Sequence, residues 1–135
     1  MSERDQQDEV RNLFAAYGAG FDDADPDAVT ELFAWPATIW QFGEGHVFED
    51  AEELAENIEA LMAVFDDAGI VVTTPDVRDI RIAGSSGFAR VDWRQEDSTG
   101  EPLHEFTCSY LLIDGDGTWR IATVVNEEPD QAAEN

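Results

Sequence analysis

The feature that most constrains the fold of this chain is a pair of apolar segments, Leu103 to Ile113 and Thr118 to Asn126, joined by Asp114-Gly115-Asp116-Gly117. Both segments are rich in β-branched and aromatic residues, which favour extended strands. The repeated Asp-Gly pair provides residues that tolerate the positive φ angles of a tight turn. The sequence therefore predicts a long β-hairpin, against which the rest of the chain packs.

Two more extended segments precede this hairpin. They run from Ile70 to Ala83, with a bend at Pro75, and from Phe88 to Glu96, with a glycine-containing turn between them. The four predicted strands can pair in sequence as a meander. Neither face of the last three strands is uniformly polar, so the sheet needs cover on both sides. We expect helices on one side and a second copy of the chain on the other.

Two helices are predicted at the start of the chain. Apolar residues recur at helical spacing from Asp5 to Asp23, which indicates a long amphipathic helix. Asp25 followed by Pro26 is typical of a helix start, because Asp caps free N–H groups and proline fits the first helical position. The pair Trp35-Pro36 is expected to end this second, short helix, because proline disfavours helical geometry in the preceding residue.

A third helix is predicted from Asp50 to Gly69, after a small hairpin formed by Ala37 to Phe42 and His46 to Glu49. Asp50 and Glu53 form an acidic variant of the capping box, and Gly69 supplies the left-handed residue that often ends a helix. The predicted fold class is therefore α+β, with three N-terminal helices packed on one side of a curved antiparallel sheet.

The length of 135 residues fits one domain, with a core from about residue 8 to residue 128 and a polar tail at 129–135. Cys108 is the single cysteine, and we expect it to be a buried, inert thiol rather than half of a disulfide. The N-terminus lacks the pattern of a signal peptide, and no apolar run approaches the roughly 20 residues that span a bilayer. A cytoplasmic location without a membrane role is expected.

The charge is strongly negative: 31 acidic residues oppose 7 basic ones, all arginine, for a net charge of −24. Such a surface repels phosphate backbones and anionic lipids, so no nucleic-acid or membrane partner is expected. Two interpretations of the acidity remain open. Dispersed carboxylates can keep a protein soluble in a high-salt host, where salt screens their repulsion, or they can steer a cationic ligand.

The sequence carries no recognised signature of a metal or cofactor. His46 and His104 occur with Glu44 and Glu105 nearby in sequence, but not at the spacing of a metal motif. A glycine-rich phosphate loop and a serine-histidine-acid signature are also missing. We therefore predict neither a bound metal nor a cofactor.

The chain combines the long first helix and the Asp25-Pro26 start with the segments Leu32 to Thr38 (LFAWPAT) and Gly117 to Ile121 (GTWRI). In these features it resembles the superfamily of nuclear transport factor two and the SnoaL-like proteins. The resemblance extends from about residue 8 to residue 128. It implies a cone of curved sheet wrapped by three helices, commonly dimeric, with a pocket at the wide end. The superfamily includes ketosteroid isomerases, polyketide cyclases, epoxide hydrolases, dehydratases and proteins without known activity, so fold alone selects none of these.

The resemblance also implies which positions of this chain correspond to the site of a ketosteroid isomerase. Its hydrogen-bond-donating tyrosine would correspond to Tyr17, its proton-abstracting aspartate would fall near Gln41, and its neutral aspartic acid near Ser109. An amide cannot accept and return a proton at neutral pH, and a hydroxyl is not a tuned carboxylic acid. Steroid isomerisation is therefore not predicted.

The same comparison predicts which residues surround the pocket, where a small apolar or amphipathic ligand would bind. Besides Tyr17 and Glu105, the predicted lining consists of Trp35, Ile39, Gln41, Leu61, Phe65, Trp93, Gln95, Thr107, Ser109, Val124 and Asn126.

Two functional hypotheses follow. The first is an enzyme of the SnoaL-like kind, performing cofactor-independent cyclisation, isomerisation or dehydration, with Glu105 as the proton-transfer group and Tyr17 as hydrogen-bond donor. The alternative is a non-catalytic ligand-binding or structural dimer module. In either case we expect a homodimer that packs through the outer face of the sheet, to which Phe106 and Tyr110 would contribute.

Overall fold

The structure is a computed structural model that describes residues 3–41 and 43–127. These residues form helices α1 (Glu3–Asp22), α2 (Pro26–Thr30) and α3 (Ala51–Ala68), and strands β1 (Phe33–Gln41), β2 (Glu44–Phe48), β3 (Val72–Ala83), β4 (Ser86–Glu96), β5 (Pro102–Asp114) and β6 (Trp119–Glu127). The predicted tail, 129–135, lies outside the described residues, as does Phe42 at the end of the first predicted hairpin strand.

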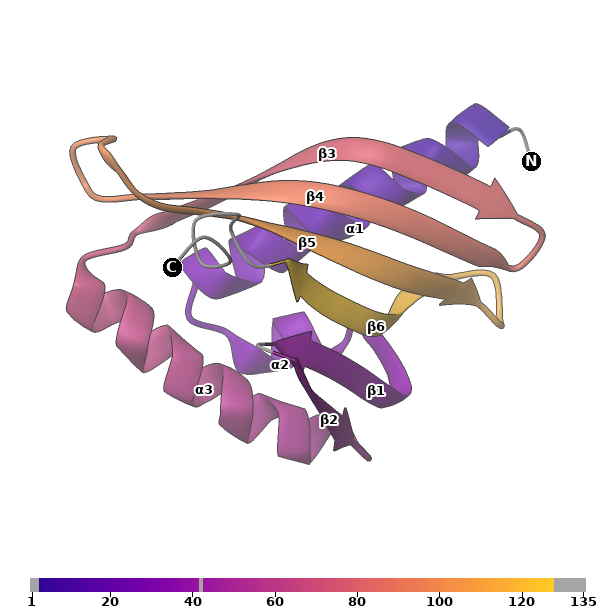
Figure 1. The fold of residues 1–135 in the computed structure, drawn as a ribbon, viewed down its shortest axis with the longest axis horizontal. Coiled ribbons are helices and arrows are strands. Elements are labelled where there is room, and N and C mark those ends of the chain that lie inside the picture. Colours follow the sequence, from indigo (N-terminus) through magenta and orange to yellow (C-terminus); the bar gives the residue numbers. More distant parts are fainter. Residues whose placement is uncertain (1–2, 42, 128–135) are drawn as a thin grey trace.

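The strands form one six-stranded sheet in the order β2-β1-β6-β5-β4-β3 (Figure 1). The predicted meander of β3, β4, β5 and β6 is confirmed, with each neighbouring pair antiparallel. The irregularity in β3 lies between Val77 and Asp79, and not at Pro75 as the sequence suggested. Strand β1 lies beside β6 and runs parallel to it, which joins the small hairpin to the long one.

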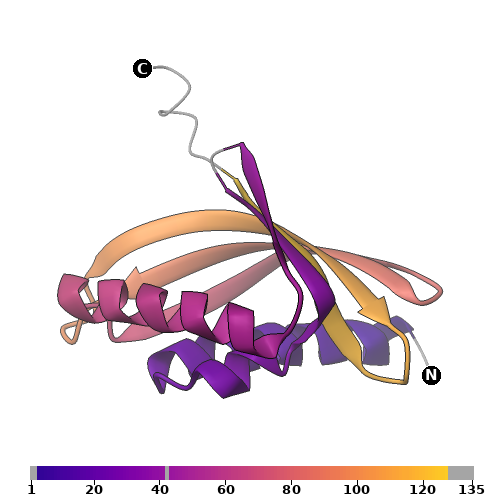
Figure 2. The same cartoon turned by 90° about the horizontal axis from the view of Figure 1, so that it is seen from below.

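All three helices lie beneath the same face of the curved sheet (Figure 2). We call this the inner face, and the opposite one the outer face. Helix α1 runs under β3 and buries Val10, Leu13 and Phe14 in the core. Gly18 permits this close approach, because a Cβ atom there would lie 2.7 Å from the carbonyl oxygen of Thr73. The α+β arrangement expected from the sequence is thus observed.

Local capping signals position the helix ends as predicted. The Asp25 carboxylate accepts a hydrogen bond from the Ala28 N–H at 3.2 Å, and the Asp50 carboxylate accepts one from the Glu53 N–H at 3.0 Å. Gly69 ends α3 with a φ angle of 83°. The two aspartate caps satisfy backbone N–H groups that the start of a helix leaves unpaired.

The predicted end of the second helix at Trp35-Pro36 is wrong. Helix α2 ends at Thr30, and β1 has already begun at Phe33. The backbone N–H of Ile121 in β6 donates a hydrogen bond to the Leu32 carbonyl oxygen at 2.8 Å. Pairing with a distant strand therefore competes with the helix and ends it early.

The alternation of side chains separates the two faces of β4 and β5. On β4, Ala89, Val91 and Trp93 are buried on the inner face. Because Cys108 pairs with Val91 and Tyr110 pairs with Ala89, both side chains of β5 also point inward. The expectation that Tyr110 and Phe106 face a partner subunit is therefore wrong, and Tyr110 is almost fully buried.

No helix within residues 3–41 and 43–127 combines the length and the apolar composition that crossing a membrane requires.

Candidate functional site

A cavity of about 280 Å³ lies between the inner face of the sheet and helices α1 and α3. Tyr17 and Phe21 of α1 and Leu61 and Phe65 of α3 form its helical wall. The strands contribute a mixed apolar and polar surface, comprising Ile39, Gln41, Thr73, Trp93, Gln95, His104, Glu105, Phe106, Cys108, Tyr110, Val124, Asn126 and Glu127. A concave apolar surface with a few polar groups is typical of small-molecule sites.

Aromatic contacts hold one side of this cavity rigidly. The ring centroid of Tyr17 lies 5.3 Å from that of Trp93 and 5.3 Å from that of Phe21. The Trp93 indole N–H donates a hydrogen bond of 2.8 Å to the Tyr110 hydroxyl. Each buried polar atom of this pair is thereby satisfied, which fixes the orientation of both rings.

The thiol and the tyrosine hydroxyls of this wall remain protonated because they are buried. Burial raises the pKa of the Cys108 thiol to about 12, and it raises the pKa values of Tyr17 and Tyr110 above their usual range. Cys108 is an unreactive thiol at neutral pH, as expected from the sequence. Within the described part of the chain the Tyr17 hydroxyl has no hydrogen-bond partner, so it is a neutral donor at the cavity.

Gln95 and His104 form the polar end of the cavity. Gln95 is completely buried, and its Oε1 lies 3.0 Å from Nδ1 of His104. The His104 ring stacks on Phe106 with a centroid distance of 4.9 Å and remains exposed. Among the described residues, Gln95 Nε2 is buried without any hydrogen-bond partner. An unpaired buried donor costs roughly 1–3 kcal/mol, which makes this atom the most unusual polar group of the site.

The structure places most of the predicted pocket residues around this cavity: Tyr17, Ile39, Gln41, Leu61, Phe65, Trp93, Gln95, Val124 and Asn126. Trp35 was misplaced by the sequence prediction. It lies on β1 outside the cavity, where it is 37% exposed and stacks on Phe33.

The predicted inward position of Thr107 and Ser109 is wrong, and that of Glu105 holds only in part, because Glu105 borders the cavity. Thr107 donates a hydrogen bond of 2.7 Å to Asp92, and Ser109 donates one of 2.7 Å to Glu127, both on the outer face. Glu105 pairs in register with Arg94 and is exposed. Although Glu105 borders the rim of the cavity, strand alternation directs its side chain outward.

The inward residues of β5 were not predicted as pocket residues from the sequence. They are His104, Phe106, Cys108 and Tyr110. The sequence separates the two alternating sets of β5 but does not state which set faces the helices. The signal that could have decided is the content of each set, because from His104 to Leu112 the set with Cys108 and Tyr110 has no acidic member. Residues of that kind are the ones most often buried.

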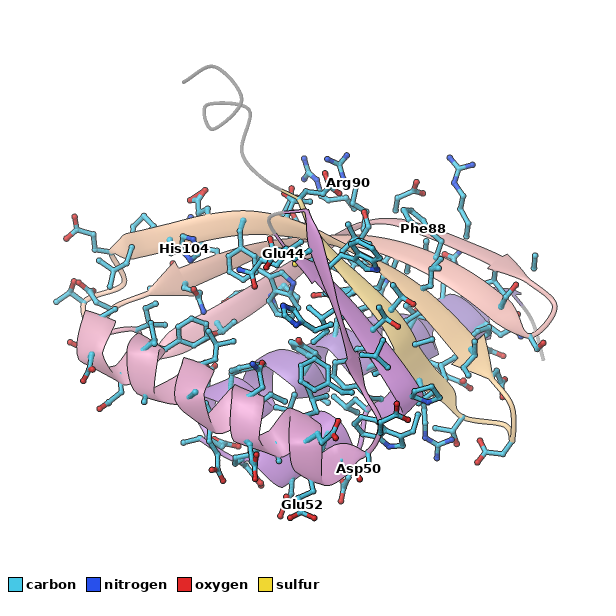
Figure 3. All side chains as sticks on the ribbon, turned by 60° about the horizontal axis from the view of Figure 1, so that its bottom comes forward. Glu44, Asp50, Glu52, Phe88, Arg90 and His104 are labelled. Carbon is cyan, nitrogen blue, oxygen red and sulfur yellow. The ribbon has the colours of Figure 1, made fainter. Side chains whose placement is uncertain are left out.

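A second hollow, of about 550 Å³, lies on the outer face and differs in chemistry. Arg90 projects there (Figure 3) and binds Glu127 through two hydrogen bonds of 3.1 and 2.9 Å. Asp92 lies 3.2 Å from the Nε atom of Arg78. Arg90 and Asp92 of the outer hollow are thus paired with oppositely charged groups in contact with water, whereas the inner cavity holds unpaired donors. We therefore take the inner cavity as the candidate site.

Three helices against one face of a curved six-stranded sheet, with a cavity between them, define the cystatin-like class of α+β domains. Within that class the chain belongs to a family of NTF2-like proteins, DUF6841, whose pattern matches residues 7–129. A comparison with curated proteins finds no match.

Several solved structures share this fold. An NTF2-like protein with a cystatin-like fold from Novosphingobium aromaticivorans is 18% identical, with a TM-score of 0.78 over 95% of this chain and 84% of that one. A cystatin-like domain of unknown function from Nostoc punctiforme is 16% identical, with a TM-score of 0.76 over 99% and 84%. A putative ketosteroid isomerase from Shewanella frigidimarina is 19% identical, with a TM-score of 0.67 over 86% and 92%. At these identities the likeness concerns the fold alone.

Proposed function

We propose that the protein binds a small, neutral, largely apolar molecule in the inner cavity, through an oxygen atom that accepts a hydrogen bond from Gln95. The observation that carries this proposal is the buried, unpaired Nε2 atom of Gln95. A ligand oxygen at this position removes the cost of the unpaired donor, and the aromatic wall contributes apolar contact.

Charge narrows the class of ligand. None of the arginine side chains borders the inner cavity, whereas Glu105 and Glu127 lie at its rim. The net charge of −24 adds a repulsive field for anions. A carboxylate or phosphate ligand is therefore disfavoured, and a ketone, ester, ether or alcohol is favoured.

A matched pair of probes tests this proposal: 1-tetralone, which carries a ketone oxygen, and tetralin, the corresponding hydrocarbon. We expect the ketone to bind about tenfold more tightly, the ratio that corresponds to one hydrogen bond of about 1.4 kcal/mol. Titration calorimetry or tryptophan fluorescence measures both dissociation constants. Equal binding of the two probes, or no binding of either, would overturn the proposal.

The Gln95→Met variant tests whether the preference for the ketone depends on the Gln95 amide donor. It retains most of the side-chain volume and removes the amide donor, so we expect the ketone preference to disappear while tetralin binding stays unchanged. Gln7→Met on α1, outside the cavity, is the matched control and should retain the preference. A ketone preference that persists in Gln95→Met would refute the role of this amide.

The acid/base role expected for Glu105 is not part of this proposal, because its side chain belongs to the outer face. The proposed function is therefore ligand binding, without a catalytic role for Glu105.

We also propose that a second copy of the chain packs on the outer face. Leu111, Val125 and Trp40 are 52%, 40% and 45% exposed, and the register aligns Trp40 with Val125 across neighbouring strands. Beside them, arginines such as Arg90 compensate acidic side chains. In a chain with a charge of −24, a surface with compensated charges gives the least repulsion between two copies.

Sedimentation velocity measures this association. We expect the wild type to sediment as a dimer and Leu111→Glu to sediment as a monomer, because the new carboxylate would be desolvated in the interface. Val64→Glu is the matched control, since Val64 is 60% exposed on α3. A monomeric wild type, or a dimer that Leu111→Glu leaves intact, would refute the proposed interface.

A further inference from the structure

We infer that His104 is a general base at the mouth of the inner cavity, held by Gln95, and that the ligand is a substrate from which His104 removes a proton. This inference rests on the proposed binding of a neutral ligand at Gln95 and adds a reaction to it. The substrate class is a neutral molecule with a weakly acidic C–H bond and an oxygen on which negative charge develops.

The hydrogen bond with Gln95 sets the state of the His104 ring. With the Gln95 amide oxygen facing the ring, the 3.0 Å contact is a hydrogen bond in the tautomer that carries the proton on Nδ1 of His104. In the neutral ring the other nitrogen, Nε2, then carries a lone pair. Stacking on Phe106 restricts the ring plane, and the ring is exposed, so water can receive the proton afterwards.

Gln95 connects the two charges that the reaction creates. Its Oε1 faces His104, which becomes positive on accepting a proton, while its Nε2 is free to donate to the substrate oxygen, which becomes negative. Both charges polarise the amide in the same direction, so each hydrogen bond strengthens the other. Since Gln95 is fully buried, this interaction acts in a low dielectric.

A second donor borders the same cavity. Tyr17 borders the cavity from α1, and burial raises the pKa of its hydroxyl, which therefore remains protonated. The other acidic groups at the rim, Glu105 and Glu127, have side chains assigned to the outer face. Among the described residues, His104 is consequently the one side chain on the inner side of this cavity with an imidazole nitrogen that can act as a base.

The elimination reaction of 5-nitro-1,2-benzisoxazole tests for such a base, because this neutral probe needs only one proton removed. Nε2 of His104 takes the proton from the ring carbon, the electrons of that C–H bond form the third carbon–nitrogen bond, and the nitrogen–oxygen bond breaks. The oxygen leaves as a coloured phenolate with its electron pair, facing the Gln95 amide. The proton on His104 passes to water.

We expect His104→Phe to lower kcat about 100-fold, the lower limit of the usual contribution of a general base. The variant retains a ring that can stack on Phe106, and His104→Gln serves as a second variant should the first fail to fold. His46→Phe is the matched control, because His46 is the only other histidine and does not border the cavity. An unchanged rate in both His104 variants, or an equal loss in His46→Phe, would overturn the inference.

The tautomer of His104 gives a readout that does not depend on turnover. Nitrogen-15 NMR of the imidazole ring should show the proton on Nδ1 in the wild type and a shift towards Nε2 in Gln95→Met, since the methionine offers no oxygen acceptor. A wild-type ring protonated on Nε2 would refute the role of Gln95. A protein that prefers 1-tetralone over tetralin yet does not accelerate the elimination would retain the proposed function and lose this inference.

Discussion

The two faces of strands β4 and β5 are built from alternate residues of the same segments, yet their polar groups have different surroundings. On the inner face, Trp93 and Tyr110 share one fixed hydrogen bond, and Gln95 has one partner for two polar atoms. On the outer face, Glu127 accepts from both Arg90 and Ser109 in contact with water. Burial, more than residue type, therefore decides how much a polar group contributes to stability and what it can bind.

The largest expected effect is the loss of the inner aromatic wall. Trp93 is 2% exposed, so Trp93→Ala should lower the free energy of unfolding by about 4 kcal/mol through lost burial and a new void. The outward neighbour Arg94→Ala should leave it nearly unchanged, because its ion pair with Glu96 is exposed. Urea unfolding at pH 7 measures both variants. Similar losses of unfolding free energy in Trp93→Ala and Arg94→Ala would contradict the proposed difference between the inner and outer faces.

Removing one hydroxyl should have a smaller effect that still depends on the face. Tyr110→Phe retains the ring but leaves the Trp93 N–H without its acceptor, so we expect a loss of about 2 kcal/mol. Thr107→Val removes a hydroxyl that binds Asp92 beside solvent and should cost much less. If Thr107→Val proved as costly as Tyr110→Phe in urea unfolding, burial would not be the deciding variable.

Gln95→Met should stabilise the ligand-free protein, by about 1 kcal/mol, because it removes a buried donor that has no partner. The same variant is expected to lose the ketone preference, so stability and binding should change in opposite directions. Thermal unfolding without ligand measures the gain. A destabilised variant would indicate that this amide serves the fold and not the site.

The smallest effect concerns the ion pair of the outer face. Partial burial acts to raise the pKa of Glu127, but hydrogen bonds from Arg90 and Ser109 and the charge of Arg90 outweigh it, so this pKa lies below its ordinary value of 4.5. A lowered folded-state pKa contributes stability above pH 4.5 that is lost as the pH falls through the folded value. The stability difference between wild type and Arg90→Gln should therefore be small at pH 7 and vanish in acid. A difference that grows below pH 4.5 would contradict this sign.

Much of the fold follows from local sequence signals, because caps and turns depend on neighbouring residues. Asp25, Asp50 and Gly69 act at the positions that their residue types predicted. The end of α2 was predicted incorrectly because the hydrogen bond between Ile121 and Leu32 joins residues far apart in the sequence.

The site was predictable only in part for the same reason. The helical residues Tyr17, Leu61 and Phe65 follow from the apolar stripes of their helices. In β5 a period of two yields two sets of residues, and only the register with β4, which aligns Cys108 with Val91, assigns the inward set. One inverted assignment moved Thr107 and Ser109 into the predicted pocket and removed His104 from it.

Helix α3 gives the cavity a wall that is independent of the sheet. It is capped at both ends, packs mainly against α2, and reaches α1 through Phe65, whose ring centroid lies 5.8 Å from that of Phe21. Among the described residues no ladder of backbone hydrogen bonds connects α3 to a strand, so its place beside the sheet depends on side-chain packing, to which the buried Leu54 and Ile58 contribute. The width of the cavity is therefore set by side chains, and substitutions between α3 and its neighbours would alter the cavity while every strand pair stays intact.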